Sequence, residues 1–309
     1  MIEVQNLRKQ YGDLVAVEDV SFTAEAGQIF GLLGPNGAGK STTISCLCGL
    51  LPPTSGQVRI LGHDVVQDGP ASRQQLGVVP QELALYEDLN AADNLAYWGA
   101  AYGLSGAALR SRVSTVLEAI GLLDRAKEPV SQFSGGMKRR LNLGCAIVHE
   151  PKVLLLDEPT VGVDPQSRVR LLELVRELVD AGTCVLYTTH YMEEAEALCD
   201  RLAILDHGRI IAAGTLNELR GRVSDRDLVR LSGQFPVEAV RGALEALAEA
   251  EVLQIEEDQL RLAIQAAGSR LPELFQVVQQ AGGEIRETNV ARPSLESLFI
   301  ELTGKELRE

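Results

Sequence analysis

One stretch of nine residues constrains the fold of this chain more than any other. It has glycine at its first and sixth positions, followed by a lysine and two hydroxyl residues. In a glycine-rich turn of this pattern, backbone N–H groups point inward and surround phosphate oxygens. The sequence therefore predicts a phosphate-binding loop. The loop consists of Gly34, Pro35, Asn36, Gly37, Ala38, Gly39, Lys40, Ser41 and Thr42.

The residues on either side of this loop support the interpretation. An apolar run at 29–33 predicts a strand that enters the loop, and residues 42–51 are compatible with a helix that leaves it. The motif binds phosphate in this strand–loop–helix context, where the helix N-terminus adds positive partial charge. Lys40 would reach the β- and γ-phosphates, and the Ser41 hydroxyl would be a ligand of Mg²⁺. The expected ligand is a nucleoside triphosphate.

The composition excludes several classes of protein. The formal net charge is −14, which argues against a broad nucleic-acid-binding surface because such a surface needs a basic face. The chain has no run of 18 apolar residues, so no membrane span is expected, and its N-terminus does not resemble a signal peptide. The five cysteines match no zinc or redox spacing and are expected to be buried thiols in a reducing compartment. We therefore expect a cytoplasmic protein.

Hydrophobic periodicity predicts a large first domain, residues 1–221. Short alternating runs in its first 30 residues predict antiparallel strands. A segment at about 83–150 has helical spacing and is expected to form a helical subdomain. Continuous apolar runs at 153–156 and 184–188 alternate with helical patterns, which favours a mainly parallel core sheet in an α/β fold.

A smaller second domain is expected at residues 222–309, after a polar linker that begins at residue 222. Its pattern alternates short strands with amphipathic helices in the order βαββαβ, which is typical of a ferredoxin-like α+β unit. The expected elements are a strand at 228–231, a helix at 237–248, strands at 252–255 and 260–264, a helix at 271–280 and a strand at 284–290. A last helix is expected at 294–302.

Two acidic residues directly follow the apolar strand at 153–156. Because α/β sheets bind ligands at the carboxyl ends of their strands, Asp157 is expected to hold Mg²⁺ and Glu158 to polarise the attacking water. His190 follows the next apolar strand and could contact the γ-phosphate. Taken alone, the two acids could also be solvated residues at a strand end.

Two further segments carry polar groups that could reach a nucleotide. Ser134, Gly135 and Gly136 open a helix with free backbone N–H groups, which makes an anion site, although a plain serine cap would show the same pattern. Gln81 ends a strand, and its amide could bind a water ligand of Mg²⁺. On its own a glutamine at a strand end is a weak signal.

Together these segments resemble the ATP-binding cassette family, the nucleotide-binding subunits of ABC transporters, over about residues 1–220. The family's motifs occur in order as Gly34–Thr42 (Walker A), Gln81 (Q-loop), Ser134–Gly136 (signature core), Asp157 and Glu158 (Walker B and catalytic glutamate), Gly162–Asp164 (D-loop) and His190 (switch). Tyr11 resembles the aromatic residue that stacks on adenine, although a half-buried aromatic at a strand end would look the same. The signature departs from the commonest form at Phe133 and Met137, and the D-loop at Val163.

The resemblance implies an ATPase that uses ATP and Mg²⁺. Lys40, Gln81, Glu158 and His190 would be catalytic. Ser41, Gln81 and Asp157 would hold Mg²⁺. Tyr11, the Walker A residues, Ser134, Gly135, Gly136 and Asp164 would contact ATP. Family members dimerise head to tail, so the Ser134 loop of one copy would close over the ATP held by Lys40 of the other.

The tail at 292–304 is similar to that of ATPase subunits serving type-two ABC exporters of drugs, polyketides, polysaccharides or sodium. This implies a homodimer that drives export through a separate transmembrane permease, lies peripherally on the cytoplasmic face of the membrane and binds no nucleic acid. The alternative is a soluble, non-transport ABC ATPase that acts as a regulatory, nucleic-acid-associated or ribosome-associated switch. One cassette per chain and the acidic charge count against it.

Overall fold

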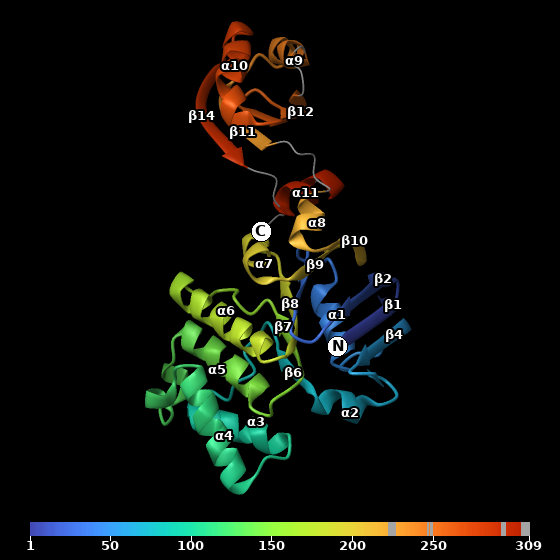
Figure 1. Ribbon diagram of the computed structural model, residues 1–309, viewed down its shortest axis with the longest axis vertical. Helices are drawn as coiled ribbons and strands as arrows, with labels where there is room; N and C mark the ends of the chain where they lie inside the picture. The colour runs from blue at the N-terminus through green and yellow to red at the C-terminus, as the bar shows by residue number, and fades with distance from the viewer. Residues whose placement is uncertain (222–226, 246, 248–249, 292–294, 304–309) are drawn as a thin grey trace. The chain divides into compact units, whose positions relative to one another are not determined.

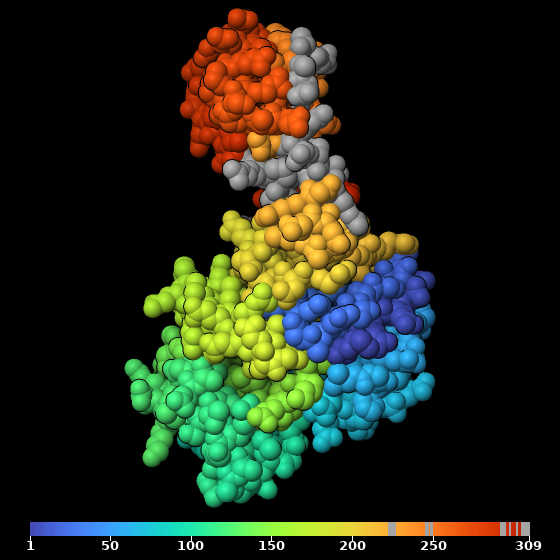
Figure 2. Space-filling model, in the orientation of Figure 1, coloured from blue at the N-terminus to red at the C-terminus, as the bar shows by residue number. Residues whose placement is uncertain are grey.

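The computed structural model describes residues 1–221, 227–245, 247, 250–291 and 295–303. These residues form two compact units, Met1–Thr215 and the residues from Leu216 onward, so the second unit begins somewhat before the boundary expected at residue 221. The expected linker residues 222–226 and the tail residues 292–294 and 304 lie outside the described residues. Figure 2 shows the N-terminal strands (blue) and the helical segment (green) on different parts of the first unit's surface.

The first unit is built on one sheet in the order β5-β4-β1-β2-β10-β9-β3-β8-β7-β6 (Figure 1). Its parallel part confirms the predicted core. That part consists of β6 (Leu76–Val79), β7 (Val153–Asp157), β8 (Cys184–Thr189), β3 (Ile29–Leu33) and β9 (Arg201–Asp206). The predicted antiparallel part consists of β1 (Ile2–Tyr11), β2 (Leu14–Ala24), β4 (Ser55–Ile60) and β5 (His63–Asp64), and β10 (Arg209–Gly214) runs antiparallel to β9.

The helices of the first unit include a helical segment where it was predicted. The helices are α1 (Lys40–Leu47), α2 (Gly69–Gln74), α3 (Ala91–Ala101), α4 (Gly106–Ala119), the 3₁₀ turns η1 (Leu123–Arg125) and η2 (Val130–Gln132), α5 (Gly135–Ile147), α6 (Pro165–Asp180) and α7 (Met192–Leu198). In the helical segment, α3 packs on both α4 and α5. None of the helices in the described ranges has the length and apolar character that a bilayer crossing would need.

The central strands of the parallel sheet are buried on both faces. Every residue of β3, β7 and β8 is buried, which explains why their sequences are continuous apolar runs rather than alternating ones. Phe22 of β2 stacks on Phe30 of β3 with ring centroids 4.8 Å apart. This core fixes the carboxyl ends of three neighbouring strands, in the order β3-β8-β7, at one edge of the sheet.

The second unit has the predicted ferredoxin-like order. Its elements are α8 (Leu216–Arg220), β11 (Asp227–Gln234), α9 (Val237–Glu245), β12 (Ala250–Ile255), β13 (Gln259–Ile264), α10 (Ala267–Gln280), β14 (Glu284–Ala291) and α11 (Leu295–Thr303). The antiparallel sheet has the order β12-β13-β11-β14, so β13 lies between the two strands that α9 connects. That arrangement is the split βαβ unit. Within the same unit, α11 packs on α8.

Candidate active site

The loop at residues 34–42 connects β3 to α1 and needs glycine at two positions. A Cβ on Gly34 would collide with the carbonyl oxygen of Leu205. Gly39 has a φ of 109°, and a Cβ there would lie 2.6 Å from the carbonyl oxygen of Ala16. Side chains at these positions would therefore push the loop away from β2 and β9, whereas Asn36 and Gly37 at the loop tip are exposed.

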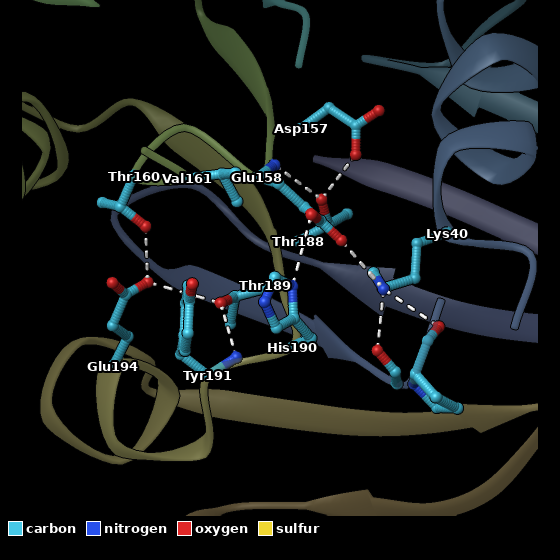
Figure 3. A network of polar contacts seen from close by, with 12 residues as sticks. Lys40, Asp157, Glu158, Thr160, Val161, Thr188, Thr189, His190, Tyr191 and Glu194 are labelled. Carbon is cyan, nitrogen blue, oxygen red and sulfur yellow. Dashed lines mark hydrogen bonds and ion pairs between the residues drawn. The ribbon is translucent and has the colours of Figure 1, made fainter. Parts of the chain in front are cut away.

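Lys40 occupies the base of this loop and is only 4% exposed. Its Nζ donates to the carbonyl oxygens of Gly34 (2.7 Å) and Pro35 (3.1 Å) and forms an ion pair with Glu158 Oε1 at 2.9 Å (Figure 3). A lysine ammonium has three protons to donate. All three are therefore directed at oxygens of the loop and of the carboxylate that follows β7.

Thr188 of β8 holds both acidic residues at the end of β7. Its hydroxyl donates to Asp157 Oδ1 at 2.7 Å and accepts from the backbone N–H of Glu158 at 3.0 Å. The same N–H lies 3.2 Å from the Thr188 carbonyl oxygen. Glu158 has a φ of 46°, a left-handed conformation that is uncommon for a side-chain-bearing residue and that clusters at functional sites.

His190 completes the group around Glu158. Its Nδ1 lies 3.3 Å from Glu158 Oε2, although the contact lacks the geometry of a hydrogen bond. The two oxygens of Glu158 therefore face a lysine on one side and an imidazole on the other (Figure 3). Lys40, Glu158 and His190 come from segments far apart in sequence, and the neighbouring ends of β3, β7 and β8 bring them together.

The signature residues form a second cluster, with the segment around Asp164. Ser134 caps α5, and its Oγ accepts from the backbone N–H of Met137 at 3.3 Å. A Cβ on Gly136 would lie 2.5 Å from Ser167 Cβ and 3.2 Å from Asp164 Oδ2, so the start of α6 packs directly on this glycine. Gly135 is exposed beside it.

Asp164 caps α6. Its carboxylate accepts from the backbone N–H of Ser167 at 3.0 Å, and this hydrogen bond lowers the pKa of Asp164. The predicted contact between Asp164 and ATP stays a prediction.

Gln81 follows β6, and its backbone is tied to the rest of the site through Arg139. The Nη1 of Arg139 donates to the Gln81 carbonyl oxygen at 2.6 Å, and its Nη2 reaches the Val161 carbonyl oxygen at 3.4 Å. Arg139 on α5 thus joins the Gln81 segment to the segment between Glu158 and Asp164. The Gln81 residue itself is exposed, and its predicted contact with a nucleotide or Mg²⁺ stays a prediction.

Tyr11 ends β1, next to the turn into β2. The residue is 42% exposed, and Lys9 Nζ lies 5.2 Å from the ring centroid. An exposed ring at this position is compatible with adenine stacking, which stays a prediction.

The oxygen donors proposed for Mg²⁺ fit the chemistry of that ion. Ser41 is exposed in the first turn of α1, and Asp157 Oδ2 has no hydrogen-bond partner within the described ranges. Mg²⁺ prefers oxygen ligands and is often held by one or two carboxylates together with substrate phosphates and water. The described part of the chain contains no group of three His, Cys, Asp or Glu residues that could bind a metal by itself. Oxygens of Ser41, Asp157 and Gln81 would suit an ion that arrives with a nucleotide, and this assignment stays a prediction.

Several residues of the site were not singled out from the sequence. They include Thr160, Tyr187, Arg139, Arg168 and Glu194, of which Thr160, Tyr187 and Glu194 are buried. For Glu194 no sequence signal existed, because only the packing of α7 distinguishes it from the neighbouring Glu193.

Comparisons with known proteins show the family of this chain. Residues 17–161 match a family model described as ABC transporter, and residues 214–303 match one described as the C-terminal domain of DrrA1-3-like ATP-binding proteins. The chain is 43% identical to the linearmycin resistance ATP-binding protein LnrL of Bacillus subtilis over the full length of both. It is 40% identical to the daunorubicin resistance ATP-binding protein DrrA3 of Streptomyces coeruleorubidus, covering 99% of this chain and 97% of the other.

A third relative is the Nod factor export ATP-binding protein I of Cupriavidus metallidurans, 39% identical over 100% of this chain and 99% of the other. Among solved structures, an ATP-binding subunit of an ABC transporter superposes with a TM-score of 0.66 at 36% identity, covering 72% of this chain and 92% of that chain. A second structure, an ATP-binding cassette of an ABC transporter in its ADP conformation, has a TM-score of 0.64 at 24% identity and supports the fold alone.

Proposed function

The chain belongs to the ABC transporter family of ATP-binding proteins, and we propose that it is the subunit that hydrolyses ATP to drive export of a solute through a separate membrane permease. The observation that carries this proposal is the contact of Lys40, Glu158 and His190 at the end of the glycine-rich loop. Relatives named for drug resistance and for Nod factor export are similar over both units, which supports the type-two exporter class.

The geometry supports a division of tasks among the three residues. Lys40 would exchange one of its present oxygen partners for the β- and γ-phosphates of ATP. Glu158 would then accept a proton from the water that attacks the γ-phosphorus, because a carboxylate at the end of β7 faces the base of the loop. His190, 3.3 Å from that carboxylate, would hold the same water and the γ-phosphate in line.

The Mg²⁺ would be held by Ser41 and Asp157, with Gln81 reaching it directly or through water. When bound, the ion neutralises charge that develops on the phosphate oxygens. Thr188 would fix the orientation of Asp157 through the 2.7 Å hydrogen bond to Oδ1, which leaves Oδ2 for the ion.

The complete site would need two copies of the chain. Ser134 and Asp164 belong to a cluster at the N-termini of α5 and α6 and are not among the residues that contact Lys40. In a head-to-tail homodimer, the α5 N-terminus of one copy would face the phosphates bound by the other and supply backbone N–H groups and a positive helix end. The dimer would lie on the cytoplasmic face of the membrane, attached through the permease.

The substitution Glu158→Gln tests the proposed reaction. It should keep ATP binding, trap an ATP-bound dimer and slow hydrolysis by about a hundredfold or more, within the range for loss of a general base. The exposed Glu193→Gln is a matched control that should hydrolyse ATP like the wild type. Phosphate release and size-exclusion chromatography with ATP and Mg²⁺ measure both effects. Wild-type hydrolysis by Glu158→Gln would refute the assignment of the base.

The transport half of the proposal needs a second measurement. The chain should co-purify from membranes with a protein that has several apolar spans of ~20 residues each, and that protein should stimulate its ATPase activity. Association with ribosomes in place of a membrane protein would refute export and favour the non-transport alternative.

A further inference from the structure

A buried carboxylate outside the Lys40 cluster connects three segments of the site. Glu194 on α7 is 6% exposed. Its Oε2 accepts hydrogen bonds from Thr160 Oγ1 (2.8 Å), Tyr187 Oη (2.8 Å) and Thr189 Oγ1 (3.3 Å). Figure 3 shows Glu194 with Thr160 and Thr189 turned toward it. The three donors belong to the segment after β7, the interior of β8 and the end of β8.

The second oxygen of Glu194 faces α6. Oε1 lies 3.3 Å from Arg168 Nε, an electrostatic contact without hydrogen-bond geometry. The Arg168 guanidinium also lies 5.1 Å from the ring centroid of Tyr191, and that ring lies 4.1 Å from the ring of His190. The backbone N–H of Arg168 donates to the carbonyl oxygen of Asp164 at 2.9 Å. Through Arg168, the carboxylate therefore reaches the first turn of the helix that Asp164 caps.

The residues that donate to Glu194 are close in sequence to both Glu158 and His190. Thr160 comes two residues after Glu158, and Thr189 directly precedes His190. Thr189 Oγ1 also accepts from the backbone N–H of Tyr191 at 2.9 Å, which fixes the chain on both sides of His190. A single carboxylate is thus hydrogen-bonded to residues that flank both members of the 3.3 Å contact.

We propose that Glu194 is a positioning residue that sets His190 against Glu158 and ties both to the start of α6. The inference rests on the proposed ATPase function. Glu194 touches neither the loop lysine nor a phosphate position, so its loss should lower the turnover rate and leave ATP affinity nearly unchanged. If the buried carboxylate served stability alone, its removal would lower the melting temperature without this selective loss of turnover.

Glu194→Gln is the primary test because it keeps the size of the side chain. The amide retains one oxygen for the hydroxyl donors but turns an N–H toward Arg168 or toward the hydroxyls, so one set of contacts is lost. Glu193→Gln, the same substitution at the exposed neighbour on α7, is the matched control. ATP affinity, kcat, KM and the melting temperature are measured for both in the full chain.

The expected result for Glu194→Gln is a fall in kcat of about tenfold or more, equivalent to at least about 1.4 kcal/mol, with ATP affinity within about twofold of the wild type. Glu193→Gln should match the wild type in every measurement. Should Glu194→Gln prove unstable, Thr160→Val removes one donor and leaves the carboxylate in place. It should show the same selective fall in kcat, by a smaller factor.

A double-mutant cycle with His190→Ala tests whether Glu194 acts through His190. When two residues act as a unit, removing the second adds little to the loss caused by the first. Glu194→Gln should therefore lower kcat by less than about twofold in the His190→Ala background. Losses that multiply, a parallel fall in kcat and ATP affinity, or a change in melting temperature alone would each overturn the proposal.

The outcomes also separate this inference from the proposed function. Wild-type protein that binds ATP and does not hydrolyse it, alone or with its permease, would overturn both. Wild-type and Glu193→Gln proteins that hydrolyse ATP, beside a Glu194→Gln protein with the same kcat, would overturn only the role of Glu194.

Discussion

The substitution Thr188→Val removes one hydroxyl that orients both acidic residues at the end of β7. Valine has nearly the shape of threonine, so β8 should keep its packing. The hydroxyl donates to Asp157 Oδ1 at 2.7 Å and accepts from the Glu158 N–H at 3.0 Å. Its loss leaves the Asp157 carboxylate, which is 6% exposed, without this donor.

The cost of this change follows from the two contacts. A hydrogen bond to a carboxylate contributes about 1.5–3 kcal/mol. The Glu158 N–H keeps the Thr188 carbonyl oxygen at 3.2 Å, so its share of the loss should be small. We expect the free energy of unfolding to fall by about 2 kcal/mol and the melting temperature by about 4–8 °C. If poorer positioning of Asp157 and Glu158 raises the activation free energy by the same amount, about 2 kcal/mol, kcat would fall by about thirtyfold.

Thr183→Val is the matched control, because the Thr183 hydroxyl precedes the same strand and makes no hydrogen bond to the residues that the structure describes. Thermal unfolding and phosphate release are measured for the wild type and both variants. Thr183→Val should stay near the wild type in both assays. If Thr188→Val behaves like Thr183→Val, the hydroxyl does not organise the two acids and the argument for its role is wrong.

Three further predictions concern packing, pH and thiol reactivity. Gly136→Ala places a Cβ 2.5 Å from Ser167 Cβ and should cost about 1–3 kcal/mol of stability, measured by denaturant unfolding. Burial lowers the pKa of His149 below 6.5, so the unfolded state binds more protons and stability should fall as pH drops below about 6.5. Between about pH 7.5 and 5.5 the melting temperature should depend less on pH in His149→Gln than in the wild type. The substitution His63→Gln, at an exposed histidine, should leave that dependence unchanged. Burial raises the pKa of the Cys145 thiol, so this thiol should react with a disulfide reagent at pH 8 only after unfolding.

The convergence of the Lys40 cluster could be predicted from the sequence, for a topological reason. The apolar runs that form β3, β7 and β8 are each followed directly by a motif or residue with a predicted role in ATP hydrolysis. Parallel strands present their carboxyl ends at one edge of a sheet. The strand order β3-β8-β7 then makes Lys40, Glu158 and His190 neighbours. The second unit was predictable on similar grounds, since its amphipathic helices and short strands alternate in an order that few folds use.

The Glu194 network was out of reach of the same reasoning. Glu193 and Glu194 are identical side chains at successive positions, and only the packing of α7 shows that the second is 6% exposed while the first faces solvent. Its partners Thr160, Tyr187 and Thr189 lie up to 34 residues away in sequence. Threonines at strand ends are common, so nothing in their spacing indicates that they share one acceptor. Such a network depends on side-chain directions, which hydrophobic periodicity does not contain.

The ion pair between Lys40 and Glu158 affects how the Glu158→Gln experiment is interpreted. Lys40 directs its three protons at Gly34, Pro35 and Glu158, so a phosphate that takes one of them must displace an oxygen already present. The two carbonyl oxygens belong to the loop, whereas the Glu158 side chain can move. A Glu158 oxygen held by the ammonium at 2.9 Å is directed at Lys40 and not at an attacking water. Phosphate binding would therefore release the base, and Glu158→Gln, which removes a competitor for Lys40, should not weaken ATP binding.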